Sequence, residues 1–425
     1  MPTLIFCPAV VVNNWVQEWQ KFSNLPASRV IALNKSQKER TLQVREADIG
    51  TIFVTNYEAL LMEDLMQEIT KKFYGRKCAV VFDESHRIKD PKAKRTKVAI
   101  KLSDIFSHRY ILSGSPVLKS YMDLFTQFRV MDKSVFGTNY FSFRARYFRD
   151  KNAGMPSHKH FPDFVLLPDA EKEIKRLVDQ KACFAKREDC LDLPPLVKVR
   201  IETELAPEQR RLYESMRKNF VAMLKTDKGE TKASIAELVI TKVLRMQQIV
   251  SGHLRVENDD GTVATLSIKD NPRKKTLQGI LEDICPKHKV IVWSVFRDNY
   301  QDIREVCEKL GLGYVELTGE TKDKPAAIKQ FNEDPETHVL IGNQGAGGIG
   351  VNLVAASYMV YYTRSFSLEH DIQSEARNYR GGSEIHSKIT RIDIVAPQTI
   401  DELVLETLAN KQEISESILR QNFLR

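Results

Sequence analysis

Several features that define other classes of protein are missing from this sequence. The six cysteines are scattered and none forms a Cys-x-x-Cys pair, so neither a zinc ribbon nor a disulfide framework is indicated. We expect them to be buried thiols in a reducing compartment. No signal peptide and no apolar run of transmembrane length occurs, so we expect a soluble, cytoplasmic protein without a membrane partner.

A further absence concerns phosphate binding. No Gly-x-x-x-x-Gly-Lys-[Ser/Thr] segment occurs anywhere in the 425 residues, so a phosphate-binding loop of that type is excluded within them. The glycine-dense stretch Gly342–Gly350 permits close approach of a ligand to the backbone, but it contains no lysine. Taken alone, that stretch could be merely a tight loop.

The composition is that of a soluble globular protein with two or three domains. Hydrophobic residues make up 42% of the chain and charged residues 28%, which is ordinary. The 64 Lys and Arg against 56 Asp and Glu give a net charge of +8. This excess fits a polyanionic partner without establishing one.

The chain is organised around the segment Cys78–His86. Its five apolar residues Cys78–Phe82 predict a strand buried on both faces of a parallel sheet, and Asp83, Glu84 and His86 follow at once. Ligands bind at the carboxyl ends of strands in open α/β sheets. Neighbouring carboxylates there can position a hydrated Mg²⁺ and polarise a water. The alternative is a strand end with solvated charges and an N-cap.

Strand-like segments alternate with helical patterns in two series, which predicts an α/β protein of two tandem lobes, each a parallel sheet flanked by helices. We expect the first lobe at 1–135, a helical basic and aromatic insertion at 136–190, the second lobe at 191–400 with a helical insertion at about 206–272, and a C-terminal helix at 401–425. The polar segment Glu257–Pro272 is expected to be a flexible loop or linker.

The insertion contains a stretch, Phe141–Arg149, in which aromatic residues and arginines alternate. Arg144 and Arg146 are therefore candidates for contacts with a nucleic-acid backbone. An equally good interpretation is an amphipathic helix with its aromatic rings in the core and its arginines in solvent.

The order of the motifs resembles the Swi/Snf-type branch of the superfamily-two helicase-like ATPases, and the box at Asp83–His86 is similar to that of the annealing helicases in this branch. The resemblance implies two RecA-like lobes. Motifs Ia, Ib, II and III resemble Leu4–Trp19, Phe53–Glu58, Asp83–Asp90 and Ile111–Pro116; motifs IV, V and VI resemble Val290–Ser294, Gly345–Leu353 and Gln373–Gly382. Each is weak alone, but the seven in register are specific.

The resemblance implies the roles of the site residues. Asp83 would hold Mg²⁺ through water, Glu84 would be the general base, and Arg377 and Arg380 would reach the γ-phosphate when the lobes close. These two arginines share one face if their segment is helical. Four residues would couple the nucleotide site to the nucleic-acid groove: His86, Ser113, Ser115 and Gln373.

The implied cofactors are ATP and Mg²⁺, and the implied partner is duplex DNA, bound without sequence preference. Gly348 and Gly350 would approach the nucleotide, while Thr55 and Asn56 would contact DNA phosphates. The predicted function is a DNA-dependent ATPase that moves along or remodels double-stranded DNA. The alternative is a hydrolysis-deficient module that binds nucleic acid or a protein partner.

Two departures from the family pattern stand out. The family places its phosphate loop just upstream of motif Ia, where this sequence has Met1. We therefore expect the loop and its strand to be missing from the first lobe, through truncation or because a separately encoded upstream segment supplies them. After Arg380, the usual Gly-Gln is replaced by Gly381-Gly382.

Overall fold

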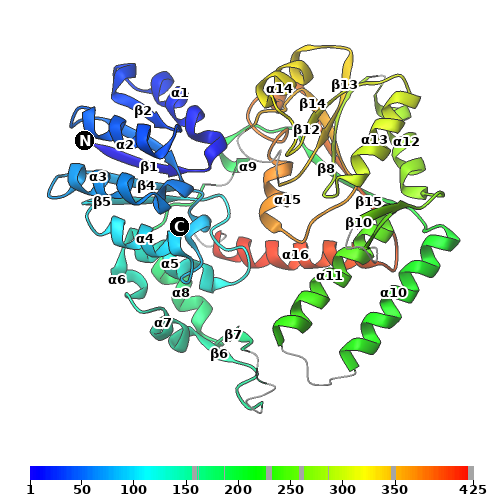
Figure 1. Cartoon of the computed structure of the whole chain (residues 1–425), viewed down its shortest axis with the longest axis horizontal. Coiled ribbons are helices and arrows are strands. Elements are labelled where there is room, and N and C mark those ends of the chain that lie inside the picture. The colour runs from blue at the N-terminus through cyan, green and yellow to red at the C-terminus, as the bar shows by residue number, and fades with distance from the viewer. Residues whose placement is uncertain are drawn as a thin grey trace. The chain divides into compact units, whose positions relative to one another are not determined.

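The computed structural model contains two compact units, each built on a parallel β-sheet flanked by helices (Figure 1). It describes residues 1–155, 160, 162–185, 187–225, 232–257, 263–285, 287–345 and 351–419. One unit comprises Met1–Phe184 with Lys411–Arg425, and the other comprises Ala185–Asn410. The predicted fold class, two α/β lobes with parallel sheets, is confirmed.

The sheet of the first unit has the strand order β2-β3-β1-β4-β5, with every neighbouring pair parallel. Short apolar runs form its central strands, as expected for strands covered on both faces. The strands are β1 (Thr3–Cys7), β2 (Val30–Leu33), β3 (Ile52–Asn56), β4 (Ala79–Asp83) and β5 (His108–Leu112). The helices between and after them are α1 (Val12–Phe22), α2 (Gln37–Glu46), α3 (Glu63–Phe73), α4 (Lys94–Ser103) and α5 (Leu124–Met131).

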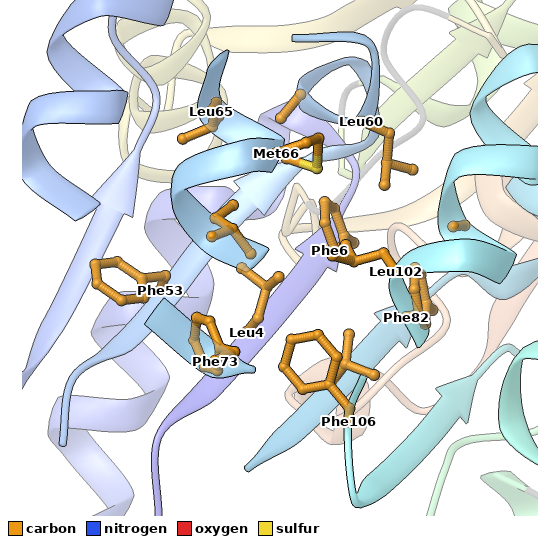
Figure 2. Packing of buried hydrophobic residues seen from close by; sticks show 14 of the residues in the cluster. Leu4, Phe6, Phe53, Leu60, Leu65, Met66, Phe73, Phe82, Leu102 and Phe106 are labelled. Atoms are coloured by element: carbon orange, nitrogen blue, oxygen red, sulfur yellow. The ribbon is translucent and has the colours of Figure 1, made fainter. Parts of the chain in front are cut away.

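One face of this sheet carries a core of aromatic and aliphatic side chains (Figure 2). Phe6 of β1 and Phe82 of β4 stack with their ring centroids 5.2 Å apart. Phe73 of α3 meets Phe53 of β3 edge-on at 6.2 Å. Burial of such rings is the main force that fixes β4, and therefore its acidic end, in the middle of the sheet.

The rest of the first unit has a separate aromatic core. One side of α5 contributes to it, together with α6 (Lys133–Phe136), α7 (Tyr140–Tyr147), the antiparallel pair β6 (Phe148–Asp150) and β7 (Phe164–Leu166), and α8 (Ala170–Asp179). The sequence did not indicate this hairpin, because strands of three residues are too short to show a period.

The sheet of the second unit has the order β12-β13-β11-β14-β15-β8, again with parallel neighbours. Its strands are β8 (Leu196–Glu202), β11 (Lys289–Trp293), β12 (Gly313–Leu317), β13 (Thr337–Gly342), β14 (Ala356–Tyr361) and β15 (Ile389–Val395). Its helices are α9 (Arg187–Cys190), α10 (Pro207–Lys225), α11 (Lys232–Ser251), α12 (Pro272–Ile284), α13 (Asp298–Lys309), α14 (Lys324–Glu333) and α15 (Leu368–Glu375); α16 (Ile400–Leu419) begins here and ends in the other unit.

The prediction of a flexible loop or linker at Glu257–Pro272 was wrong for residues 263–267. Strand β10 (Val263–Ser267) pairs antiparallel with β9 (His253–Glu257), and Ser267 lies opposite His253. The alternating pattern of β10 covers only five residues and is bordered by turn-forming residues, so the sequence did not predict a strand there.

The cysteine prediction was right for four residues and wrong for two. Cys7, Cys78, Cys285 and Cys307 are buried free thiols. Burial raises the pKa of Cys7, Cys285 and Cys307 to about 12, so these thiols stay protonated. Cys183 and Cys190 are exposed; the first follows α8 and the second ends the short helix α9. Among the described helices, none has the length and apolar character needed to span a membrane.

Candidate active site

The acidic pair lies at the carboxyl end of β4, between β1 and β5 in the sheet. Asp83 is held from three sides. Its Oδ2 accepts a hydrogen bond from Trp15 Nε1 at 2.8 Å, and its Oδ1 accepts one from the Glu84 amide at 3.0 Å. The Tyr57 hydroxyl donates to the Asp83 carbonyl at 2.7 Å. Burial raises the pKa of Asp83, and the hydrogen bond from Trp15 acts against that rise.

Glu84 adopts a left-handed backbone conformation, with φ of 54° and ψ of 52°. A residue other than glycine in this region costs free energy and persists only where the surroundings enforce it. The conformation turns the chain sharply from β4 into the short 3₁₀ helix Ser85–Ile88. The Glu84 carboxylate remains partly exposed, as a group that meets solvent or a ligand must be.

The structure brings three of the four predicted coupling residues together. His86 is buried, and its Nδ1 lies 3.3 Å from Glu84 Oε2 and 3.3 Å from Ser113 Oγ. Ser113 follows β5, and its Oγ accepts a hydrogen bond from the Ser115 amide at 3.1 Å. A polar chain therefore leads from the carboxylate of Glu84 to the loop after the neighbouring strand.

Gln127 of α5 is a further member that the sequence did not indicate. Its Oε1 accepts a hydrogen bond from Ser85 Oγ at 2.7 Å, and its Nε2 donates to the Pro116 carbonyl at 2.7 Å. Gln127 is fully buried and so ties the loop after β4 to the loop after β5. Its apolar neighbours on the same helix face, Leu124 and Val130, were a signal that it is buried, but they do not indicate its partners.

Thr55 and Asn56, the predicted DNA contacts, lie at the end of β3. Thr55 is fully buried, and its hydroxyl donates to the Leu33 carbonyl at 3.1 Å. Arg40 Nη1 donates to Thr55 Oγ1 at 3.3 Å and to Asn56 Oδ1 at 2.8 Å. Both side chains are thus engaged by a buried arginine of α2 that sequence reasoning missed.

Arg144 and Arg146 lie on α7, and their surroundings differ. The Arg144 guanidinium lies 4.1 Å from the ring centroid of Phe164, while Arg146 pairs with Glu173 at 2.7 Å. Phe143 belongs to the core of this region. The buried aromatic rings therefore agree in part with the interpretation as an amphipathic helix. Contact with DNA stays a prediction for both arginines.

In the second unit, the predicted site residues gather around the end of α15. Gln373 lies on this helix, which ends at Glu375, so Arg377 and Arg380 lie in the turns that follow it. Arg377 is buried, and its carbonyl accepts a hydrogen bond from the Leu353 amide at 3.0 Å. Arg380 Nη1 donates to the Val351 carbonyl at 3.3 Å. Gly348 and Gly350 lie outside the described residues.

A buried ionic network fixes α15 to the sheet of the second unit, and it too was missed. Arg391 of β15 pairs with Glu375 at 2.5 Å, with Asp393 at 3.3 Å and with Asp371 at 3.4 Å. Arg364 also pairs with Asp371 and Asp393. Both guanidinium groups lie within 5 Å of the Tyr361 ring centroid. Burial acts to lower the pKa of Arg391, but neighbouring Tyr361 and the surrounding carboxylates raise it overall.

The donor set at β4 fits a hydrated Mg²⁺. Among the described residues there is no cluster of three or more His, Cys, Asp or Glu side chains that could enclose a metal. Mg²⁺ in phosphate-handling sites keeps several waters and takes one or two carboxylates together with the phosphates of its ligand. Each Asp83 oxygen accepts one hydrogen bond and retains a second lone pair for a metal-bound water.

Two parallel α/β lobes, the first with a carboxylate pair at the end of a central strand, define a class of proteins that act on ligands at strand ends. The SNF2-related domain matches residues 1–253, more than half of the chain, and the helicase conserved C-terminal domain matches residues 273–382. The chain therefore belongs to the SNF2-related family of helicase-like ATPases.

The individual relatives are distant and longer. An uncharacterized ATP-dependent helicase of Mycoplasma genitalium is 26% identical over 99% of this chain, which spans 37% of that protein. A Caenorhabditis elegans homologue of SWI/SNF-related matrix-associated actin-dependent regulator of chromatin subfamily A-like protein 1 is 25% identical over 97% of this chain, which spans 55% of it. The Sulfolobus solfataricus SWI2/SNF2 ATPase core in complex with dsDNA aligns with a TM-score of 0.42 and 21% identity, over 99% of this chain and 82% of that one.

Proposed function

We propose that this protein is a DNA-dependent ATPase that moves along or remodels double-stranded DNA. The observation that carries the proposal is the acidic pair at the end of β4, which is bonded to residues of two other predicted motifs and reaches a third through His86. Asp83 is bonded to Trp15 and Tyr57, and Glu84 lies beside the contact between His86 and Ser113. Solvated charges at an ordinary strand end do not need such a framework.

In the proposed reaction, Glu84 orients the attacking water and takes its proton, because its carboxylate is partly exposed at the strand end. Asp83 orients the water shell of Mg²⁺, which supplies charge compensation on the phosphates when bound. Through the contact of Glu84 with His86, and of His86 with Ser113, a movement of the Glu84 carboxylate alters the position of the loop after β5. Coupling of hydrolysis to the DNA-binding surface would follow this route.

Arg377 and Arg380 are the proposed arginine fingers, with Gln373 beside them in sequence. Such fingers contribute about 10³–10⁵ to kcat in related phosphoryl transfers. The ionic network around Arg391 supports this proposal, because it ties α15 rigidly to β15 immediately before the two arginines. Gly348 and Gly350 are proposed to approach the nucleotide through their backbone amides.

Duplex DNA is the proposed partner, bound through its backbone and without sequence preference. The support is the net charge of +8 and the two arginines of α7. Arg144 and Arg146 are proposed contacts with the phosphates. Thr55 and Asn56 are also proposed contacts, for which Asn56 is the better placed because Thr55 is fully buried.

The phosphate-binding loop is proposed to come from a segment outside these residues, since no Gly-x-x-x-x-Gly-Lys-[Ser/Thr] occurs within them. The same absence favours the second candidate function, a module that binds nucleic acid or protein without hydrolysis. Duplex DNA affinity that is indifferent to ATP, in a preparation that includes every associated polypeptide, would support this second candidate.

The decisive experiment joins a phosphate-loop segment to the chain and measures DNA-stimulated ATP hydrolysis with and without Glu84→Gln. We expect duplex DNA to stimulate turnover and the substitution to abolish it, while nucleotide binding persists, because the amide cannot accept the proton. Glu46→Gln, on an exposed glutamate of α2 outside the predicted motifs, is a matched control and should retain turnover. Undiminished turnover in the Glu84→Gln protein would contradict the assignment of the base.

A further inference from the structure

The carboxylate of Asp83 accepts a hydrogen bond from a side chain on a helix, that of Trp15. It lies on α1, and its Nε1 donates to Asp83 Oδ2 at 2.8 Å. Its ring packs against the small core of the opposite sheet face, which includes Ile5, Val30 and Val54. The position of the donor is therefore set by packing and not by the hydrogen bond alone.

The carboxylate of Asp83 has little rotational freedom left. One oxygen accepts from the Trp15 indole and the other from the Glu84 amide, while the Tyr57 hydroxyl holds the carbonyl of the same residue. The next residue, Glu84, is in a left-handed conformation that an unsupported chain would leave. These hydrogen bonds fix both the plane of the carboxylate and the turn that carries it.

We propose that Trp15 is a positioning residue for Asp83, which orients the carboxylate for the water shell of a divalent cation. The inference rests on the proposed role of Asp83 toward hydrated Mg²⁺. Hydrogen-bond partners of metal-binding side chains fix their orientation, and loss of such a partner typically weakens metal affinity 10–100-fold. Because this cation is bound through water, we expect the lower end, about tenfold.

Trp19 provides a matched control within the same helix. It lies one turn after Trp15 and packs against the same core. Its Nε1 is buried and has no hydrogen-bond partner among the described residues. Trp19→Phe therefore removes a similar volume from the same interface without removing a bond to Asp83.

The test titrates Mn²⁺, as a probe for Mg²⁺, into the 425-residue protein in the presence of a non-hydrolysable ATP analogue, which supplies the phosphates, and measures the free ion by electron paramagnetic resonance. The proteins are the wild type, Trp15→Phe, Trp19→Phe and Asp83→Asn. We expect Asp83→Asn to remove one site, Trp15→Phe to weaken that site about tenfold, and Trp19→Phe to change it less than twofold. Thermal unfolding of all four proteins identifies any loss that comes from misfolding.

A second measurement checks the bond without metal. Asp83→Asn should shift the tryptophan emission of the wild type but not that of the Trp15→Phe protein, because the shift requires the indole beside the carboxylate. Absence of any Asp83-dependent Mn²⁺ site would overturn the proposed metal role, and the inference with it. An Asp83-dependent site with equal affinity in wild type and Trp15→Phe, or weakened equally by Trp19→Phe, would overturn the Trp15 inference alone.

Discussion

At the scale of single residues, the site contains a strained backbone conformation at Glu84 that the surrounding hydrogen bonds stabilise. Glu84 is one of two described residues other than glycine with a positive φ, the other being Gln398. It occupies the position where the chain must turn away from the sheet so that its carboxylate reaches the strand end. The cost of this geometry is part of the site, and it is measurable.

Glu84→Gly should make the protein more stable than Glu84→Ala by about 1 kcal/mol. The left-handed conformation costs about 1–2 kcal/mol for a residue with a Cβ, and the larger chain entropy of glycine offsets roughly 0.5–1 kcal/mol of the relief. Both substitutions remove the same carboxylate, so their difference isolates the backbone term. Urea denaturation followed by circular dichroism measures it, and a less stable glycine variant would contradict the strained conformation.

Asp132 should make the stability of the protein depend on pH. Its hydrogen bonds with Ser134, followed by that with Lys181, lower its pKa from 3.8 to about 2. A lowered pKa means that the ionised form stabilises the fold above pH 3.8 and that this contribution is lost as the pH falls toward 2.

Asp132→Asn should therefore cost about 1–2 kcal/mol at pH 7 and progressively less between pH 5 and pH 3. Urea denaturation at a series of pH values measures the difference from the wild type. Asp48→Asn, on a well-exposed side chain, serves as the control and should change the free energy of unfolding by less than about 0.5 kcal/mol. A pH-independent difference for Asp132→Asn would refute the assignment.

At the scale of elements, α15 depends on the network around Arg391. The helix is only eight residues long, which is too short to be stable from its own hydrogen bonds. Arg391 and Arg364 fix it by pairing with Asp371 on the helix and Asp393 on β15. The proposed arginine fingers follow this helix directly, so their orientation depends on these buried ion pairs.

Arg391→Leu should destabilise the protein by about 3–5 kcal/mol, because removing one member leaves buried carboxylates without compensation. Arg200→Leu is the matched control on the neighbouring strand β8, where the arginine is much more exposed and pairs with Glu202 and Glu402. It should cost less than about 1 kcal/mol. Equal losses of unfolding free energy for the two variants would show that the network contributes no more than a surface pair.

At the scale of the whole molecule, the basic balance predicts how DNA affinity responds to salt. Contacts with phosphates release counterions, so the logarithm of the binding constant should fall linearly with the logarithm of the salt concentration. Replacing Arg144 and Arg146 together by alanine should reduce the slope by about two if both contact phosphates. Fluorescence anisotropy with a labelled duplex measures this slope. Lys329→Ala, on the exposed face of α14, is the control, and an unchanged slope in the double variant would exclude both arginines.

The sequence by itself determined the alternation of strands and helices and the place of the acidic pair. Runs such as Cys78–Phe82 have a local cause, since a strand covered on both faces must be apolar along its whole length. The pair of carboxylates after such a run therefore had to lie at the carboxyl end of a strand inside the sheet. Short strands such as β6 and β10 were not predicted, because a few residues between turn-forming neighbours show too little alternation of apolar and polar side chains.

Only the tertiary structure decided which distant side chains support the site. Trp15 and Gln127 reach the acidic loop from other helices, and Arg391 reaches α15 from a strand. Arg40 occupies the polar groups at the end of β3, which the sequence alone would leave open to DNA. These contacts depend on how helices pack on the sheets, and packing is set by many buried residues at once, so no local pattern encodes them.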